Sequence, residues 1–250
     1  MVGWLGEAVG GLADLILPTP CAGCRARGDR QICAMCRARL DASRPHATTP
    51  TPAPPGMPAC WALGGYEPPL RDLLLEYKER GRHTLATPLG DHLARVVATV
   101  APGRAVLLVP VPATAAARRE RFGDHMLRLA RRAARRLGTA GQPAAVATVL
   151  RALPRQDSTT LDAAGRVRAA RDAFEVPPGP ASRLRGAVAR GAAVVVVDDI
   201  VTTGATLAAV AVLLATHRVP VTGAAVLAAT RRTGTRPVAA PRSDRSQPAV

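Results

Sequence analysis

The 250-residue chain is poor in aromatic residues, in lysine and in long apolar runs. Phe, Trp and Tyr make up only 2% of it, which argues against recognition of nucleic acid by base stacking, because that mode needs exposed rings. Lys78 is the only lysine, so nearly all of the positive charge is arginine. No stretch of about 18 uninterrupted apolar residues occurs, so no membrane span is predicted. Residues 1–17 lack a basic leading region and contain Glu7 and Asp14, which is unlike a secretory signal, and we expect a cytoplasmic protein.

Positive charge is concentrated in the later part of the chain. Residues 1–100 hold 11 basic and 9 acidic groups, whereas residues 101–250 hold 23 and 9, giving net charges of +2 and +14. Such asymmetry favours polyanionic partners, either phosphorylated small molecules or nucleic acid. Arginines spread around a helix predicted at 113–137 either follow a nucleic-acid backbone or form an ordinary solvated surface. The candidate nucleic-acid contacts are Arg131, Arg132, Arg135 and Arg136.

Four of the five cysteines form two Cys-x-x-Cys pairs, which are Cys21 with Cys24 and Cys33 with Cys36. Two intervening residues allow both thiolates of a pair to reach one metal, and a second pair completes a tetrahedral zinc site. Without a secretion signal, metal binding is favoured over disulfides. A closed shell of four thiolates predicts a structural role for the zinc. The alternative is a set of plain thiols that has lost its metal.

Composition and periodicity divide the chain into five parts. We expect an amphipathic helix at 1–20, the four-cysteine zinc-binding module at 21–42, a Pro-rich linker at 43–60, one large domain at 61–230 and a disordered tail at 231–250. Within the large domain, strands are predicted at 106–111, 146–150, 193–197 and 219–229, helices at 70–77, 89–100, 113–137 and 206–215, and a mobile loop at 151–176. This alternation predicts an α/β fold, a mostly parallel sheet flanked by helices, with the ligand crevice at the carboxyl ends of the strands.

The most specific pattern spans residues 194–206, where four valines precede two acids, two apolar residues and a Thr-Thr-Gly-Ala-Thr turn. A helix that begins after this turn presents free N–H groups to an anion, and glycine lets the backbone approach a phosphate closely. The two carboxylates can accept hydrogen bonds from two ribose hydroxyls. The alternative is an acidic strand end followed by an ordinary Thr-capped helix. The predicted ribose 5-phosphate contacts are Asp198, Asp199, Thr202, Thr203, Gly204, Ala205 and Thr206.

This pattern resembles the 5-phosphoribosyl-1-diphosphate (PRPP) signature of type I phosphoribosyltransferases. With the four-cysteine module in front and the motifs at 66–71, 78–81 and 109–112, the order and spacing resemble the ComF family of DNA-uptake (competence) proteins. The resemblance implies a type I phosphoribosyltransferase-like sheet, PRPP bound with Mg²⁺, and Asp198 and Asp199 as catalytic residues. The pyrophosphate-binding residues that we expect are Lys78, Val111, Pro112, Arg118 and Arg119.

Two segments depart from the family pattern. Residues 121–125 read Arg-Phe-Gly-Asp-His, where ComF proteins usually have Arg-Gly-Phe-Asn-Gln. Ser158, Thr160 and Ala169 stand where the family tends to have Gln, Gly and Asn. PRPP binding therefore follows more directly from the residues than catalysis does.

Three functions remain open at this level. The first is a ComF-type protein that binds PRPP with Mg²⁺ and assists the handling of single-stranded DNA in transformation, together with DNA-uptake machinery. The second is an active phosphoribosyltransferase, which moves ribose 5-phosphate to a nitrogen acceptor. The third is a PRPP sensor without turnover.

Overall fold

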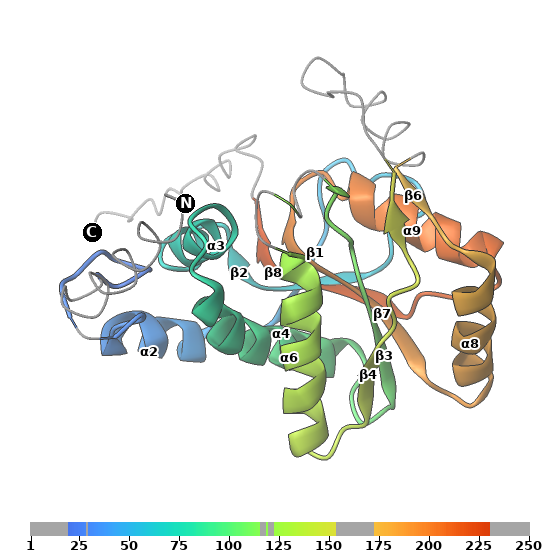
Figure 1. Ribbon diagram of the computed structural model, residues 1–250, viewed down its shortest axis with the longest axis horizontal. Coiled ribbons are helices and arrows are strands. Elements are labelled where there is room, and N and C mark those ends of the chain that lie inside the picture. Colours follow the sequence, from blue (N-terminus) through green and yellow to red (C-terminus); the bar gives the residue numbers. More distant parts are fainter. Residues whose placement is uncertain (1–19, 29, 116–118, 120–122, 154–172, 231–250) are drawn as a thin grey trace, which may run out of the picture.

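The computed structural model describes residues 20–28, 30–115, 119, 123–153 and 173–230. Their main feature is a six-stranded sheet of order β1-β2-β8-β7-β3-β4 (Figure 1). The β2–β8, β8–β7, β7–β3 and β3–β4 pairs are parallel, and only the edge pair β1–β2 is antiparallel. The strands are β1 (His46–Thr48), β2 (Cys60–Gly65), β3 (Val106–Pro110), β4 (Ala144–Val146), β7 (Ala193–Val201) and β8 (Gly223–Ala229). A separate two-stranded sheet pairs β5 (Arg151–Ala152) with β6 (Phe174–Glu175).

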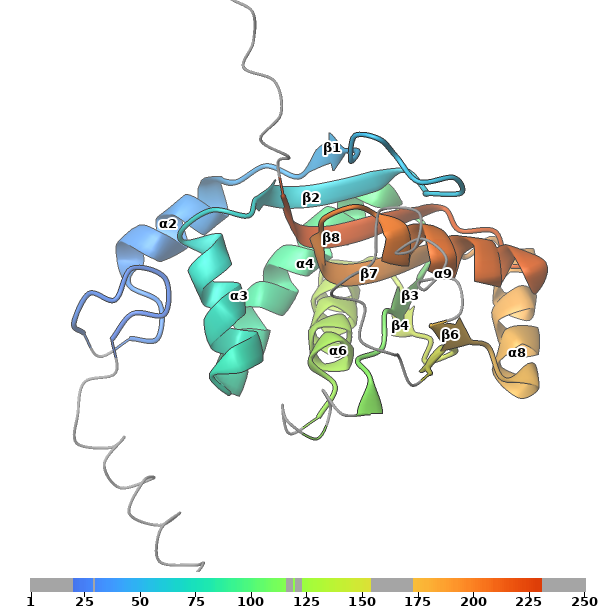
Figure 2. The same ribbon diagram turned by 90° about the horizontal axis from the view of Figure 1, so that it is seen from above.

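Helices cover both faces of the main sheet. Val195 and Val197 of β7 pack in one apolar cluster with α3, α4 and α6, whereas Val194 and Val196 pack in another with α8 and α9. Successive side chains of a strand point to opposite faces, so the run of valines serves both layers. Figure 2 shows the helices on the two sides of the sheet. The helices are α2 (Ala34–Ala42), α3 (Leu70–Glu79), α4 (Ala86–Val100), α6 (His125–Thr139), α8 (Pro178–Ala189) and α9 (Ala205–Thr216), with a 3₁₀ turn η1 (His83–Leu85). The predicted parallel sheet flanked by helices is confirmed.

Several predicted boundaries shift. The strand predicted at 193–197 continues through both acids to Val201, because β8 keeps pairing with it, Asp198 opposite Val226 and Ile200 opposite Ala228. The strand predicted at 146–150 instead lies at Ala144–Val146. The predicted start of the long helix at 113–137 is also wrong, since α6 begins at His125 with Asp124 as its N-cap. Among the described residues, no helix is both long and apolar enough to cross a membrane.

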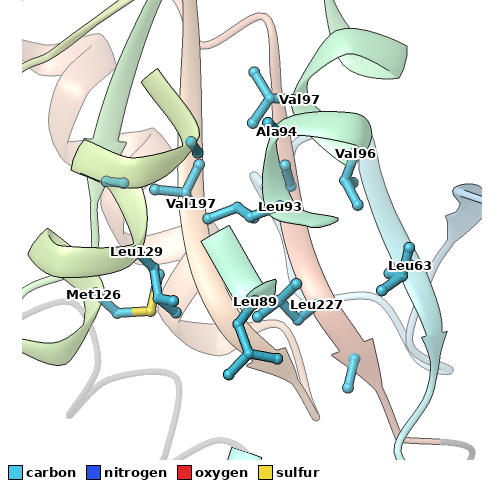
Figure 3. Packing of buried hydrophobic residues seen from close by; sticks show 14 of the residues in the cluster. Leu63, Leu89, Leu93, Ala94, Val96, Val97, Met126, Leu129, Val197 and Leu227 are labelled. Atoms are coloured by element: carbon cyan, nitrogen blue, oxygen red, sulfur yellow. The ribbon is translucent and has the colours of Figure 1, made fainter. Parts of the chain in front are cut away.

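The sequence suggested that the arginines of this helix are spread around it, and the structure shows that those of α6 are not. One face of α6 is buried against the sheet and α4, so the arginines are confined to the remaining face. The buried stripe consists of Met126, Leu129, Ala130, Ala133, Ala134 and Leu137. Figure 3 shows part of this packing, in which Leu89 and Leu93 of α4 lie between Met126 and Leu129 of α6 on one side and Leu227 of β8 and Leu63 of β2 on the other.

The cysteine segment packs directly onto the large domain. Cys21, Ile32 and Leu40 belong to the same apolar cluster as α3 and α4. The buried carboxylate of Glu76 on α3 forms an ion pair with Arg25 of the cysteine segment, with 2.6 Å between Oε1 and Nη2. The segment and the domain therefore share one core.

The prediction of a linker at 43–60 is partly wrong, because this segment contributes a strand to the sheet. His46–Thr48 forms β1, an edge strand paired with β2. Further along, Pro50 and Met57 lie against Gly204 at the start of α9. Proline is tolerated beside an edge strand, where one side of the ladder needs no donor. Most of the helix predicted at 1–20 (residues 1–19), most of the loop predicted at 151–176 (residues 154–172) and the tail predicted at 231–250 lie outside the described residues.

The crossing of α4 and α6 depends on Gly90. A Cβ atom at this position would lie 2.6 Å from Cβ of Arg132 and 3.2 Å from the carbonyl oxygen of Leu129. Neither atom is the free end of a flexible side chain, so the two helices would have to move apart.

We expect Gly90→Ala to lower the free energy of unfolding by about 1–3 kcal/mol, because overpacking outweighs the gain in helix propensity. Gly138 lies on α6 with no atom within 4 Å of the position of its Cβ, so Gly138→Ala is a matched control. The control should raise the free energy of unfolding by up to about 1 kcal/mol. Urea unfolding measures both, and equal effects of the two changes would contradict the close crossing.

Candidate active site and cysteine cluster

A cavity of about 280 Å³ opens at the carboxyl ends of β3 and β7. The loop after β3 contributes residues 111–114, β7 contributes both acids, and α9 contributes Thr206. Lys78 of α3 and His125 of α6 complete the polar lining. The structure therefore brings together predicted site residues that are far apart in the chain. Those that line the cavity are Lys78, Val111, Pro112, Asp198, Asp199 and Thr206.

The turn between β7 and α9 has the geometry of an anion site. Gly204, the N-cap of α9, has φ of +74°, a left-handed conformation that glycine adopts readily. The Ala208 amide donates to the Gly204 carbonyl, so the amides of residues 205–207 precede the helical ladder. The Ala205 amide donates a hydrogen bond to Thr203 Oγ1 at 3.4 Å. A helix start of this kind, beside a cavity lined by Thr206, can bind a phosphate.

Two side chains also pack closely against Gly204. Sδ of Met57 lies 2.5 Å from the position that a Cβ would take, and Cγ of Pro50 lies 3.3 Å from it. The segment before β2 therefore covers the side of the turn where a larger residue would project.

The two acids line the same cavity from opposite faces of β7. Asp199 has the strand parity of Val195 and Val197, so it lies on the face covered by α3 and α6. Asp198 has the parity of Val194 and Val196, and its Oδ1 accepts a hydrogen bond from the Asp199 amide at 2.9 Å. The predicted pair of ribose acceptors is therefore two carboxylates in different surroundings.

Asp199 is buried, with 5% of its surface exposed, and one of its oxygens has two partners. Oδ2 lies 2.7 Å from Nζ of Lys78 and 3.2 Å from Nε2 of His125. An ionised carboxylate only accepts, so Nε2 carries the proton of this hydrogen bond. Burial opposes ionisation of Asp199, but the His125 hydrogen bond and the Lys78 charge outweigh it and lower the pKa of the carboxyl to about 2.

His125 is the residue that the sequence analysis missed as a site residue. It is the first residue of α6, its side chain is buried, and Tyr77 Oη donates to its carbonyl oxygen at 2.8 Å. The signal available in the sequence was its place in the segment 121–125 that departs from the ComF pattern.

The predicted basic contacts separate into different environments. Arg119 is exposed and is absent from the described lining of the cavity, and Arg118 lies outside the described residues. Arg132 forms two hydrogen bonds with Asp91 of α4, at 2.7 and 2.9 Å, so it braces the α4–α6 crossing. Its place in the predicted nucleic-acid set stays a prediction, although two of its guanidinium nitrogens are already paired with this carboxylate. Arg131, Arg135 and Arg136 are exposed.

The four predicted metal ligands come together. The Sγ atoms of Cys21, Cys24, Cys33 and Cys36 all lie within 4.8 Å of one another. Zn–S bonds of about 2.3 Å in a tetrahedron place the sulfurs about 3.8 Å apart, so this spacing fits a four-thiolate site. Burial opposes ionisation of Cys21, but amide hydrogen bonds from Cys33, Cys24 and Gly23 lower the pKa of its thiol to about 6. The cluster can hold a metal ion.

Comparison with known proteins agrees with this geometry. The model of the phosphoribosyl transferase domain family matches residues 127–244, a range that includes β7, the two acids and the turn into α9. A comparison with curated proteins finds no match to this chain. The parallel sheet and the matched domain define a type I phosphoribosyltransferase-like fold with a four-cysteine cluster near the N-terminus. The domain supports a phosphoribosyltransferase-type function and suggests a ribose phosphate as its substrate.

Proposed function

We propose that this protein binds PRPP with Mg²⁺ in the cavity between β3 and β7, as a ComF-type protein. One observation carries the proposal, namely that the acids of β7, Thr206 of α9 and the loop 111–114 line a single cavity. A ribose phosphate needs hydroxyl acceptors beside a phosphate site, and the acids and the start of α9 supply both. The loop 111–114 lies where a diphosphate on the other side of the ribose would reach.

Each group has a role in this proposal. Asp198 and Asp199 accept hydrogen bonds from the ribose hydroxyls, and the amides and hydroxyls of residues 202–206 hold the 5-phosphate. Mg²⁺ binds carboxylate and diphosphate oxygens, and the ion when bound would offset part of the diphosphate charge. If the protein is a transferase, the two carboxylates also stabilise the positive charge that develops on the ribose as the diphosphate leaves.

Calorimetric titration with PRPP and Mg²⁺ tests this proposal. Removing one charged acceptor with Asp198→Asn should weaken PRPP binding by about 10- to 100-fold. Asp41→Asn serves as the control, since the Asp41 side chain is 61% exposed and lies on α2, outside the cavity lining. Equal affinities of all three proteins, or no binding by the unaltered protein, would overturn the proposal. Release of pyrophosphate when a nucleobase is added distinguishes a transferase from a sensor.

The cysteine cluster is proposed to hold a structural zinc ion. Its four thiols leave no open position for a substrate, and its segment shares the apolar core with α3 and α4. The metal would therefore stabilise the part of the core that faces α3.

We expect about one zinc per purified chain by elemental analysis. Cys33→Ser should lose the metal, and chelation should lower the melting temperature by at least about 5 °C, because structural zinc contributes directly to folding. Cys60→Ala is the control, because Cys60 is buried in a different apolar cluster and should leave the zinc content unchanged. A metal-free chain of undiminished stability would contradict the role.

A role in the handling of single-stranded DNA is favoured by the exposed arginine face of α6. Arg131, Arg135 and Arg136 are exposed on one helix whose opposite face is buried, so their charges are directed to one side. Arginines in such a row can contact successive phosphates of a flexible strand.

Changing Arg131, Arg135 and Arg136 to Ala should weaken single-stranded DNA binding and reduce its dependence on salt. Losing three phosphate contacts would reduce the slope of log affinity against log salt by about 2. The matched control replaces Arg183, Arg185 and Arg190, exposed arginines on and just after α8, and removes the same charge. Fluorescence anisotropy across a salt series measures both, and equal losses would show that only net charge matters.

A further inference from the structure

Lys78 occupies an unusual position in the cavity. It is the only lysine among 34 basic residues, and its side chain is 20% exposed. Its ammonium lies 2.7 Å from Oδ2 of Asp199, whose side chain is 7% exposed. A buried carboxylate without a cation is unfavourable, so Lys78 compensates Asp199 in the protein without ligand.

The same ammonium stands beside the loop proposed to receive the diphosphate. Lys78 and residues 111–114 line one cavity, together with Asp199. A diphosphate bound there carries more negative charge than the single carboxylate, so it competes with Asp199 for the ammonium. The compact ammonium on a flexible stem can turn between two such partners, whereas the planar guanidinium of arginine favours one fixed bidentate geometry.

Asp199 has a second donor that does not depend on Lys78. His125 Nε2 lies 3.2 Å from the same oxygen, and the His125 backbone is held by Tyr77. When the ammonium turns away, the hydrogen bond from His125 keeps the carboxylate oriented. Oδ2 then regains capacity to accept a hydrogen bond from a ribose hydroxyl.

We propose that Lys78 is a specificity-determining residue, shared between Asp199 and the diphosphate, that makes the site prefer PRPP over ribose phosphates without a diphosphate. A ligand that lacks the diphosphate leaves the ammonium on Asp199, where it competes with the ribose hydroxyls. A ligand that carries the diphosphate draws the ammonium away from Asp199. It then gains one contact with the ammonium and another between a ribose hydroxyl and the Asp199 carboxylate. This inference rests on the proposed binding of PRPP.

The single lysine makes the exchange directly observable. Protein labelled with ¹⁵N-lysine has one side-chain ammonium, that of Lys78, whose ¹⁵N resonance reports its ion-pair partner. We expect PRPP with Mg²⁺ to shift this resonance, and ribose 5-phosphate with Mg²⁺ to leave it close to its position in the free protein. A resonance that moves alike with both ligands, or that stays fixed while calorimetry shows PRPP binding, would overturn the inference. No binding of PRPP by calorimetry would overturn the proposed function itself.

Substitution gives an independent measurement on the same ligands. Lys78→Met, which keeps an unbranched side chain one atom shorter and removes its charge, should weaken PRPP binding by about 10- to 100-fold and change ribose 5-phosphate binding by less than about threefold. Lys78→Arg restores the charge, so it should recover part of the loss for PRPP. A purely structural ion pair predicts equal losses for both ligands, and that result would contradict a role in specificity. If Lys78→Met fails to fold, the labelled unaltered protein still decides the question.

Discussion

The alternation of side chains along β7 is the constraint on which the rest of the site depends. A central parallel strand must present apolar residues to both helical layers, and the four valines 194–197 do so. Because β8 pairs with β7 beyond the valines, the same alternation continues through the acids. Asp199 is thereby directed beneath α3 and α6, and Asp198 toward the opposite layer. One backbone rule thus gives two neighbouring carboxylates different chemical surroundings.

Helix α3 connects the cysteine cluster to the cavity through three consecutive residues. Glu76 forms an ion pair with Arg25 of the cysteine segment. Tyr77 donates a hydrogen bond to the carbonyl oxygen of His125, and Lys78 forms an ion pair with Asp199. Consecutive helical residues point about 100° apart, so one short helix can contact three neighbours at once. The cysteine segment therefore stabilises the same helix that places the ammonium in the cavity, although it lies outside the cavity lining itself.

The positive charge of the chain serves several purposes that net charge alone does not separate. Arg132 braces two helices through Asp91, and Arg95 donates to the carbonyls of Leu40 and Ser43 at the end of α2. Arg131, Arg135 and Arg136 instead remain exposed on α6. The basic composition is consistent with an anionic partner, but only a small part of it is available to bind one on this face.

The sequence by itself determined the features that depend on neighbouring residues. The valines, the acids and the Thr-Thr-Gly turn are contiguous, and two Cys-x-x-Cys pairs need only a short loop, so the strand, the turn that follows it and the thiol cluster were all predictable. Only the tertiary structure decided which side chains meet Asp199, because residues 78, 125 and 199 come from three separate elements. The same holds for Arg132, whose partner lies 41 positions earlier. Hydrophobic periodicity predicts which face of an element is buried, but the polar contacts between elements depend on how those faces are packed together.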